Sequence, residues 1–199
     1  FVSWADAIPS GSPTHYDVPY AFKAYALQEA HKRTGADLLL WADASIVPIR
    51  SLEPMWEKIE LDGYWISRNG WTNYQWTAES AYEWLGVTTE ENKQIPHVVA
   101  TAFGLNLRHP VGRAIFDEYL RLAGTRAFCG PWANSDNPET AGRARNGPCG
   151  PADVLGHRHD QTALSVIAWR EGCVLTDPPA WFAYSGGETD STVLIAKGL

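Results

Sequence analysis

The chain has 199 residues, of which 45% are hydrophobic and 20% are charged, so it can bury a substantial core and is expected to form a single domain. Its formal net charge of -7, together with the lack of a basic stripe, argues against nucleic-acid and anionic-membrane surfaces, which need clustered Lys and Arg. No apolar run approaches the roughly 20 residues that span a bilayer, and no secretory signal pattern is present. We therefore expect no membrane span and a cytoplasmic protein.

The first predicted elements are a strand at residues 1–4 and, after a loop rich in Pro and Gly, a helix. Asp17 can cap this helix, which is expected to begin at Val18 and to end before Gly35. Lys23 comes early in the helix, where the helix dipole disfavours a cation. Another group is therefore expected to hold Lys23.

The next element is an apolar strand that ends abruptly on a carboxylate, in the first signature of the chain, LLLWADAS at residues 38–45. Ligands gather at the carboxyl ends of such strands, and a buried Asp43 needs a cation, a sugar hydroxyl or backbone donors. The alternative is that Asp43 caps the turn that follows. Ser45 can bind a ribose hydroxyl or, through water, a metal, although serine is also an ordinary turn residue.

The middle of the chain alternates between helical and strand patterns. The expected elements are a helix at 51–59 capped by Ser51, a strand at 64–67, a helix at 78–85, a helical turn with a capping box of Thr88 and Glu91, a strand at 98–107, and a helix after Pro110. The alternation indicates an α/β fold with a mixed sheet. Trp41, Trp65 and Trp84 are expected in the core, whereas Arg68, Trp71 and Tyr74 are expected on a loop.

Residues 125–156 have a different composition, dominated by Pro, Gly, Asn and Arg, and they lack apolar periodicity. Two alternatives stay open for this segment, a lid over a binding site and a tolerated insertion. The three cysteines of the chain cannot form a closed disulfide set and are expected to be reduced. A bridge between Cys129 and Cys149 is the alternative.

The second signature, GHRHDQTALS, opens an amphipathic helix. His157 and His159 project to the same side of an extended segment, where they can share a metal, bind pyrophosphate or simply pack. Arg158 can engage phosphate oxygens bidentately or remain a solvated charge. Asp160 points inward as a helix cap, as a ligand for sugar hydroxyls, or as both, and the amide of Gln161 can contact a sugar.

The order of the two signatures resembles nucleotide-sugar-dependent glycosyltransferases of the GT-A fold, with the nearest likeness to the retaining GT8-like and capsular-sugar groups. In that family an Asp-x-Asp motif follows a hydrophobic strand, an Asp-Gln pair opens a later helix, and an acceptor-side strand similar to ATAFGLNL (100–107) lies between them. The resemblance covers the chain from about Asp17 onward. It implies an α/β fold of the GT-A type, a three-layer α/β/α sandwich with a mixed sheet over residues 1–199, with 125–156 as a lid loop.

The resemblance implies transfer of a sugar from a nucleotide diphosphate donor to a glycan acceptor hydroxyl, with retention of configuration. Together with the residue patterns described above, it leads us to expect these site residues: Asp160 and Gln161 for catalysis; Asp43, Ser45, Lys23 and Arg158 for the donor; Arg68, Trp71, Tyr74 and Asn106 for the acceptor; and Asp43, His157 and His159 for a divalent metal, Mn²⁺ or Mg²⁺. The two signatures are expected to line a common cleft.

Two departures from the family pattern have consequences. Ser45 stands where the second carboxylate of the motif is expected, so Mn²⁺ should bind weakly until donor phosphates complete its shell. The chain also starts with what looks like a later strand, so we expect an N-terminally truncated domain that lacks the base-binding strand and self-associates through an exposed sheet edge.

Two further functions remain open. One is a noncatalytic glycan-binding or structural relative of these enzymes, which would follow from the incomplete metal motif. The other is a metal-dependent hydrolase built on His157, His159 and Asp160. Binding of a nucleotide sugar favours the transferase, binding of glycans alone favours the relative, and tight zinc binding favours the hydrolase.

Overall fold

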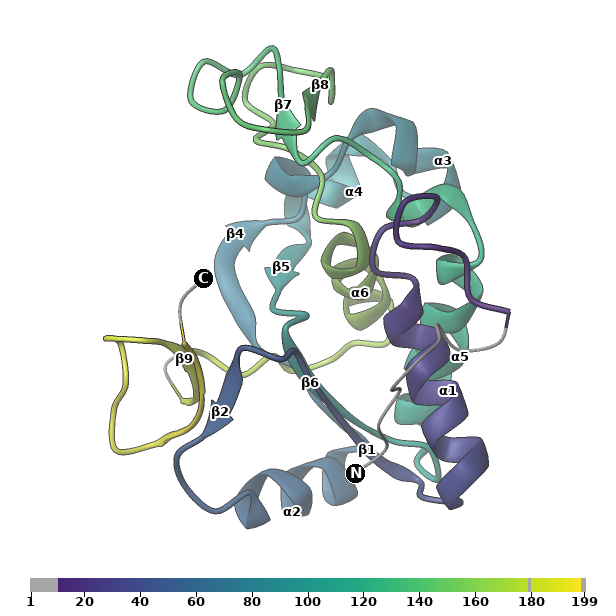
Figure 1. Cartoon of the computed structure of the whole chain (residues 1–199), viewed down its shortest axis with the longest axis vertical. Helices are drawn as coiled ribbons and strands as arrows, with labels where there is room; N and C mark the ends of the chain where they lie inside the picture. Colours follow the sequence, from purple (N-terminus) through teal and green to yellow (C-terminus); the bar gives the residue numbers. More distant parts are fainter. Residues whose placement is uncertain (1–10, 179, 198–199) are drawn as a thin grey trace.

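The computed structural model of the chain describes residues 11–178 and 180–197, so the strand expected at residues 1–4 lies outside the described part (Figure 1). The described helices are α1 (Phe22–Thr34), α2 (Glu53–Asp62), α3 (Tyr82–Leu85), α4 (Thr89–Gln94), α5 (Pro110–Ala123) and α6 (His159–Arg170), with 3-10 turns η1 (Tyr74–Trp76), η2 (Glu79–Ala81) and η3 (Arg126–Phe128). The described strands are β1 (Leu38–Ala42), β2 (Ile46–Pro48), β3 (Tyr64–Trp65), β4 (Arg68–Thr72), β5 (Pro96–Val98), β6 (Ala102–Asn106), β7 (Ala133–Asn134), β8 (Asn146–Gly147), β9 (Trp181–Tyr184) and β10 (Thr192–Ala196).

The strands form small sheets. One has the order β1-β6-β3 with antiparallel neighbours, and another has the order β2-β10-β9, in which β10 is antiparallel to β2 and parallel to β9. Strands β4 and β5 pair antiparallel, and β7 and β8 pair parallel. The mixed α/β character expected from the sequence is confirmed at this level. No described helix combines the length and hydrophobicity needed to cross a bilayer.

Helices pack on both faces of the β1-β6-β3 sheet, because side chains alternate between the two faces along each strand. Phe103 and Leu105 of β6 belong to the larger core, to which α1, α5 and α6 contribute. Ala102 belongs to a second core that contains Met55 and Ile59 of α2. Figure 1 shows α1 and α5 beside one face of this sheet and α2 beside the other.

Helix α1 begins later than the sequence predicts. Asp17 does not cap it, because its carboxylate accepts the Thr14 hydroxyl at 2.6 Å within a preceding turn. The helix starts at Phe22 and ends at Thr34, where Gly35 adopts a left-handed φ of 67° that suits glycine. The predicted end is therefore confirmed, and the predicted start was wrong.

Several other predicted elements are confirmed with changed bounds. The capping box of Thr88 and Glu91 is present. Ser51 accepts the Glu53 N–H at 3.2 Å, but the N-cap residue of α2 is Leu52, so the cap expected of Ser51 was wrong. The strand expected at 98–107 is confirmed only as β6, which pairs with β1 and β3. Val98 is the last residue of β5, which pairs with β4, and residues 99–101 belong to no strand. The helix expected at 78–85 is the 3-10 turn η2 followed by the short α3.

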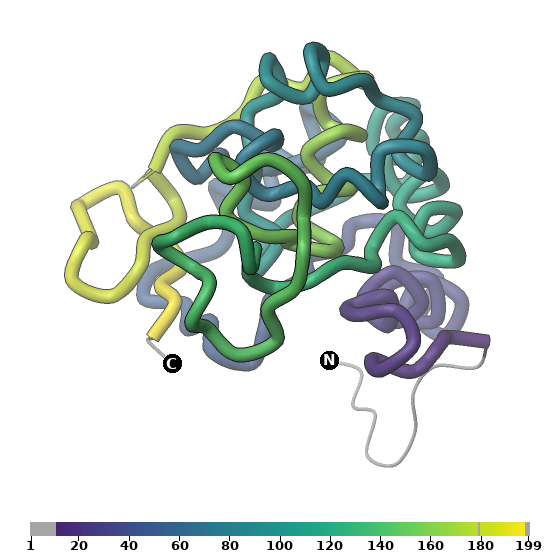
Figure 2. The backbone as a smooth tube through the Cα atoms, turned by 90° about the horizontal axis from the view of Figure 1, so that it is seen from above, coloured from purple at the N-terminus to yellow at the C-terminus, as the bar shows by residue number. Residues whose placement is uncertain are grey.

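Residues 125–156 form a folded lobe with the short strands β7 and β8, rather than a structureless loop. The buried Asn134 holds the lobe: its amide group donates to the carbonyls of Pro151 and Val154, and its Oδ1 accepts the N–H groups of Asp136 and Cys149. In the view of Figure 2 the lobe lies between the turn that precedes α1 and the C-terminal strands. The described cysteines are all free, so the alternative of a disulfide bridge was wrong.

Candidate functional site

The two sequence signatures meet at Lys23. Its Nζ lies 3.0 Å from Asp43 Oδ1 and 3.0 Å from Asp160 Oδ2, and it also donates to the Ala100 carbonyl at 3.0 Å. We call Lys23, Asp43 and Asp160 the ion cluster. The expectation that another group holds Lys23 is confirmed, since only 3% of its side chain is exposed and two carboxylates compensate its charge.

Three elements deliver the ion cluster. Asp43 follows β1, its N–H donates to the Thr101 carbonyl at 2.8 Å, and its Oδ1 accepts the Trp41 indole N–H at 2.7 Å. Asp160 lies in the first turn of α6, and Lys23 lies in the first turn of α1. The helix cap expected of Asp160 was wrong, because the N-cap residue of α6 is Arg158. The Asp43 side chain is 26% exposed and that of Asp160 only 6%, so Asp43 is the carboxylate that a ligand can reach.

Burial and charge compete within the ion cluster. Burial opposes the charge of Lys23, but the two neighbouring carboxylates outweigh this effect and raise its pKa above the ordinary value. Burial raises the pKa of Asp160 although Lys23 acts in the opposite direction. Asp160 is therefore a carboxylate whose charge depends on its lysine partner.

The two histidines of the second signature are buried, and each makes a backbone hydrogen bond. His157 Nδ1 accepts the Ala78 N–H at 3.3 Å, and its Nε2 donates to the Ala127 carbonyl at 3.2 Å. His159 Nδ1 donates to the Phe128 carbonyl at 2.8 Å, whereas its Nε2 is buried without a partner. Burial lowers the pKa of His157 well below its ordinary value and that of His159 to about 4. Both rings are therefore neutral near pH 7.

The predicted metal ligands Asp43, His157 and His159 are not brought together. Both ring nitrogens of His157 are engaged with the backbone, and the Lys23 ammonium already lies between the two carboxylates. Within residues 11–178 and 180–197 no group of three His, Cys, Asp or Glu is placed to hold a metal ion. This donor set does not fit a divalent ion, and metal dependence stays a prediction of the resemblance.

The other residues expected near the donor have structural contacts of their own. Gln161 donates its amide to the Val98 carbonyl. Ser45 lies in the turn between β1 and β2, and its carbonyl accepts the Lys197 N–H at 3.0 Å. The Arg158 guanidinium stacks on Trp76, with Cζ 3.9 Å from the ring centroid.

The expected acceptor residues do not form one group. Arg68 and Trp71 belong to β4 rather than to a loop, and Arg68 pairs with Asp177. Trp71 is 46% exposed, which leaves it available to a ligand. Asn106 was placed wrongly by the sequence, because its register partner is Leu38, at the end of β1 opposite to Asp43.

Two aromatic predictions also changed. Tyr74 lies in η1, where its hydroxyl donates to Asp153 at 2.8 Å, and burial raises its pKa to about 12. Trp84 is 42% exposed, so its expected place in the core was wrong, whereas Trp65 is fully buried as expected. Trp41 is half-buried and packs against the larger core.

Three arginines that lack an acidic partner in the described part of the chain gather near the second signature. Arg143 and Arg145 come from the 125–156 lobe, and Arg158 precedes α6. Arg158 donates to the Trp132 carbonyl at 3.2 Å and has its pKa lowered by burial and by nearby Arg143. Arg145 lies over the Trp132 ring, 6.0 Å from its centroid. We call these three residues the arginine group. Only Arg158 was predicted from the sequence.

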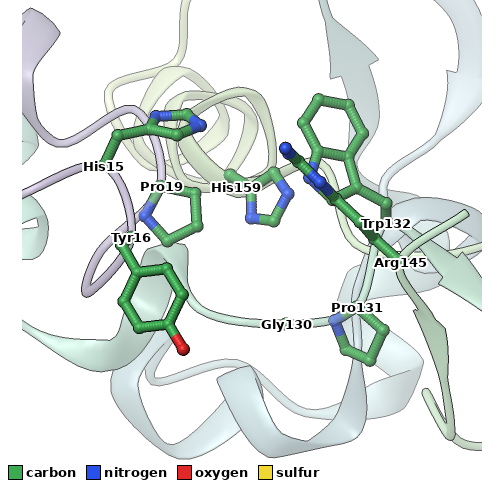
Figure 3. A pocket seen from close by; sticks show the side chains of 8 residues that line it. All are labelled: His15, Tyr16, Pro19, Gly130, Pro131, Trp132, Arg145 and His159. Carbon is green, nitrogen blue, oxygen red and sulfur yellow. The ribbon is translucent and has the colours of Figure 1, made fainter.

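A pocket of about 420 Å³ lies beside the arginine group, with the buried His159 in its wall (Figure 3). Figure 3 shows the Arg145 side chain passing in front of Trp132 toward His159, with His15 and Tyr16 on the opposite side. We call it the His159 pocket; it is lined by His15, Tyr16, Pro19, Gly130, Pro131, Trp132, Arg145 and His159.

Backbone strain gathers at the same place. Tyr20, Arg145 and His159 have left-handed φ values of 62°, 58° and 51°, which are costly for residues other than glycine. Arg145 and His159 line the pocket, and the Tyr20 ring lies 5.6 Å from the His159 ring and 5.0 Å from Lys23 Nζ. Tyr20 therefore connects the pocket to the ion cluster. No sequence pattern indicated this role of Tyr20, and the only sign of Arg145 was the arginine content of the 125–156 lobe.

No family model matches the sequence, and comparisons with curated proteins and with solved structures find no match either.

Proposed function

We propose that the chain is a GT-A-like glycosyltransferase domain, with a three-layer α/β/α arrangement, that transfers a sugar from a nucleotide diphosphate donor to an acceptor hydroxyl. The observation that carries the proposal is the contact of Lys23 with both Asp43 and Asp160 at 3.0 Å. This contact joins the two signatures that resemble the family. It brings together residues that are far apart in the sequence, and Asp43 is the carboxylate of the pair that a donor can reach.

The arginine group supports an anionic donor. The chain has a net charge of -7, yet these three guanidinium groups have no carboxylate partner in residues 11–178 and 180–197. Guanidinium groups bind phosphate oxygens bidentately, so a diphosphate is a suitable ligand. Negative charge grows on the diphosphate as its bond to the sugar breaks, and fixed cations stabilise that charge.

The proposed roles follow from exposure and hydrogen bonding. Asp43, the more exposed carboxylate, accepts hydroxyls of the donor sugar. Asp160 is a positioning residue in this proposal, because its carboxylate contacts Lys23 and receives the Tyr119 hydroxyl at 3.5 Å. Gln161 donates one amide hydrogen to the Val98 carbonyl, so its oxygen and its second N–H remain for the sugar. These roles include no metal ion, because Asp43, His157 and His159 are not placed to bind one.

A thermal unfolding screen tests the proposal. Uridine and guanosine diphosphate sugars, with and without Mn²⁺, are compared with free glycans and with Zn²⁺ alone. At a ligand concentration 100 times Kd, binding stabilises the folded chain by about 2.7 kcal/mol, which raises Tm measurably. A shift with a nucleotide sugar supports the transferase. Shifts with glycans alone would favour the noncatalytic relative, and a shift with Zn²⁺ alone would favour the hydrolase.

A further inference from the structure

The His159 pocket contains an unusual acceptor. Only 1% of His159 is exposed, and its Nε2 has no hydrogen-bond partner although it is buried. The Nδ1 hydrogen is used by the Phe128 carbonyl at 2.8 Å, which leaves a lone pair on Nε2. A buried polar atom without a partner is costly, so it points to a ligand that donates a hydrogen.

The surroundings limit what that ligand can be. Arg145 extends toward His159 in Figure 3, and its positive charge disfavours a metal cation at Nε2. The same charge favours an anionic group beside the hydrogen donor. Pro19, Pro131 and Trp132 give apolar walls that suit the C–H face of a sugar ring. The volume of about 420 Å³ lies in the range of about 300–1,000 Å³ that is typical of small-molecule sites.

We propose that the His159 pocket binds a phosphorylated sugar, in which a ring hydroxyl donates to His159 Nε2 and the phosphate pairs with Arg145. This names the class of ligand that the pocket binds. Only the source of that ligand rests on the proposed function. Two sources share this chemistry: the sugar diphosphate half of a nucleotide sugar, and a free sugar phosphate that serves as acceptor.

Two substitutions separate the hydroxyl contact from the phosphate contact. His159→Asn keeps an amide donor for the Phe128 carbonyl and tolerates the left-handed backbone, but it lacks the Nε2 acceptor. Arg145→Asn likewise suits the φ of 58° and removes the charge. Arg113→Gln is the matched control, since Arg113 lies on α5 and pairs with Asp117.

Calorimetric titrations use hexose 1-phosphate, hexose 6-phosphate, neutral hexose, inorganic phosphate, uridine and a uridine diphosphate hexose. His159→Asn is expected to weaken sugar phosphate binding about tenfold and to leave inorganic phosphate unchanged. Arg145→Asn is expected to weaken both by about tenfold or more, and Arg113→Gln neither. In labelled protein, the ¹⁵N resonance of His159 Nε2 should shift when sugar phosphate binds.

The outcomes distinguish this proposal from the proposed function. If the nucleotide sugar binds most tightly and competes with the sugar phosphate, the ligand of the pocket is part of the donor. If the two bind at the same time, the sugar phosphate is an acceptor. Sugar phosphate binding without any nucleotide-sugar binding supports the pocket and overturns the proposed function. Sugar phosphate that binds no tighter than inorganic phosphate, or an unchanged affinity in His159→Asn, overturns the pocket proposal. The pocket proposal is also overturned if His159→Asn weakens the binding of uridine but not that of sugar phosphate, because the pocket would then bind a nucleobase.

Discussion

Lys23 shows how tertiary contacts hold a residue that its own helix disfavours. It occupies the first turn of α1, where the helix dipole opposes a cation, and it is almost completely buried. The carboxylates of Asp43 and Asp160 compensate both costs, since each lies 3.0 Å from Nζ. At the scale of single residues, the two signatures depend on a lysine that belongs to neither.

Removing this cation should destabilise the fold. Lys23→Met leaves two carboxylates together without a partner, and we expect a loss of about 3–5 kcal/mol in the free energy of unfolding. The loss should shrink as the pH falls, because burial raises the pKa of Asp160 and the variant lacks the Lys23 charge that opposes this shift. Denaturant unfolding measures it, with Lys32→Met on the exposed face of α1 as the control. A loss as small as that of the control would contradict the account.

The elements were predicted well where the signal is local. The capping box at α4, the end of α1 at Gly35 and the strand β1 follow from short patterns of side chains. The strand expected at 98–107 is shortened to β6, because Val98 pairs with β4 as the end of β5, and no local pattern encodes that choice of partner. The place of Asn106 follows from strand register, which is also non-local.

The candidate site shows the same limit. Asp43 and Asp160 were recognised from their motifs, but Arg145 and Trp132 were not, because they reach the pocket through the folding of the 125–156 lobe. That segment has no apolar periodicity, and side-chain hydrogen bonds of Asn134 organise it instead. Sequence patterns of helices and strands do not report such bonds.

Asn134 should therefore control the order of the lobe. Asn134→Ala leaves four backbone groups without their partners, and we expect local stability to fall by about 2–3 kcal/mol. Hydrogen exchange of the 125–156 amides should become faster while exchange in α5 stays slow. Glu139→Ala, at an exposed position of the same lobe, is the control. Unchanged protection of the lobe would show that other contacts hold it.

At the scale of the whole molecule, buried neutral histidines should make the fold sensitive to acid. Burial lowers the pKa of His97 to about 3 and that of His159 to about 4, and it lowers that of His157 well below its ordinary value. Below pH 6.5 the unfolded chain therefore binds more protons than the folded chain, and folding loses stability as the pH falls. The raised pKa of Asp160 has the opposite effect on stability, but it is a single group, whereas three histidines have lowered pKa values.

In the unfolded chain each such histidine goes from half protonated at pH 6.5 to about nine tenths protonated at pH 5.5, which costs about 1 kcal/mol per histidine, so stability should fall by about 3 kcal/mol across this range. Chemical unfolding across this range measures the slope. His97→Asn keeps a donor for Asn73 and should reduce the slope by about one third. Equal stability at both pH values would mean that these rings are not buried in neutral form.

The central claim is that the ion cluster and the arginine group together bind a nucleotide diphosphate sugar. Calorimetric titration of the chain with uridine and guanosine diphosphate sugars tests it most directly, in parallel with the Asp43→Asn variant. We predict that one donor binds with a Kd on the order of micromolar and that Asp43→Asn weakens this binding about tenfold or more, because a hydrogen bond to a charged acceptor is lost. Binding of glycans alone, with no nucleotide sugar bound by the unmodified chain, would contradict the claim.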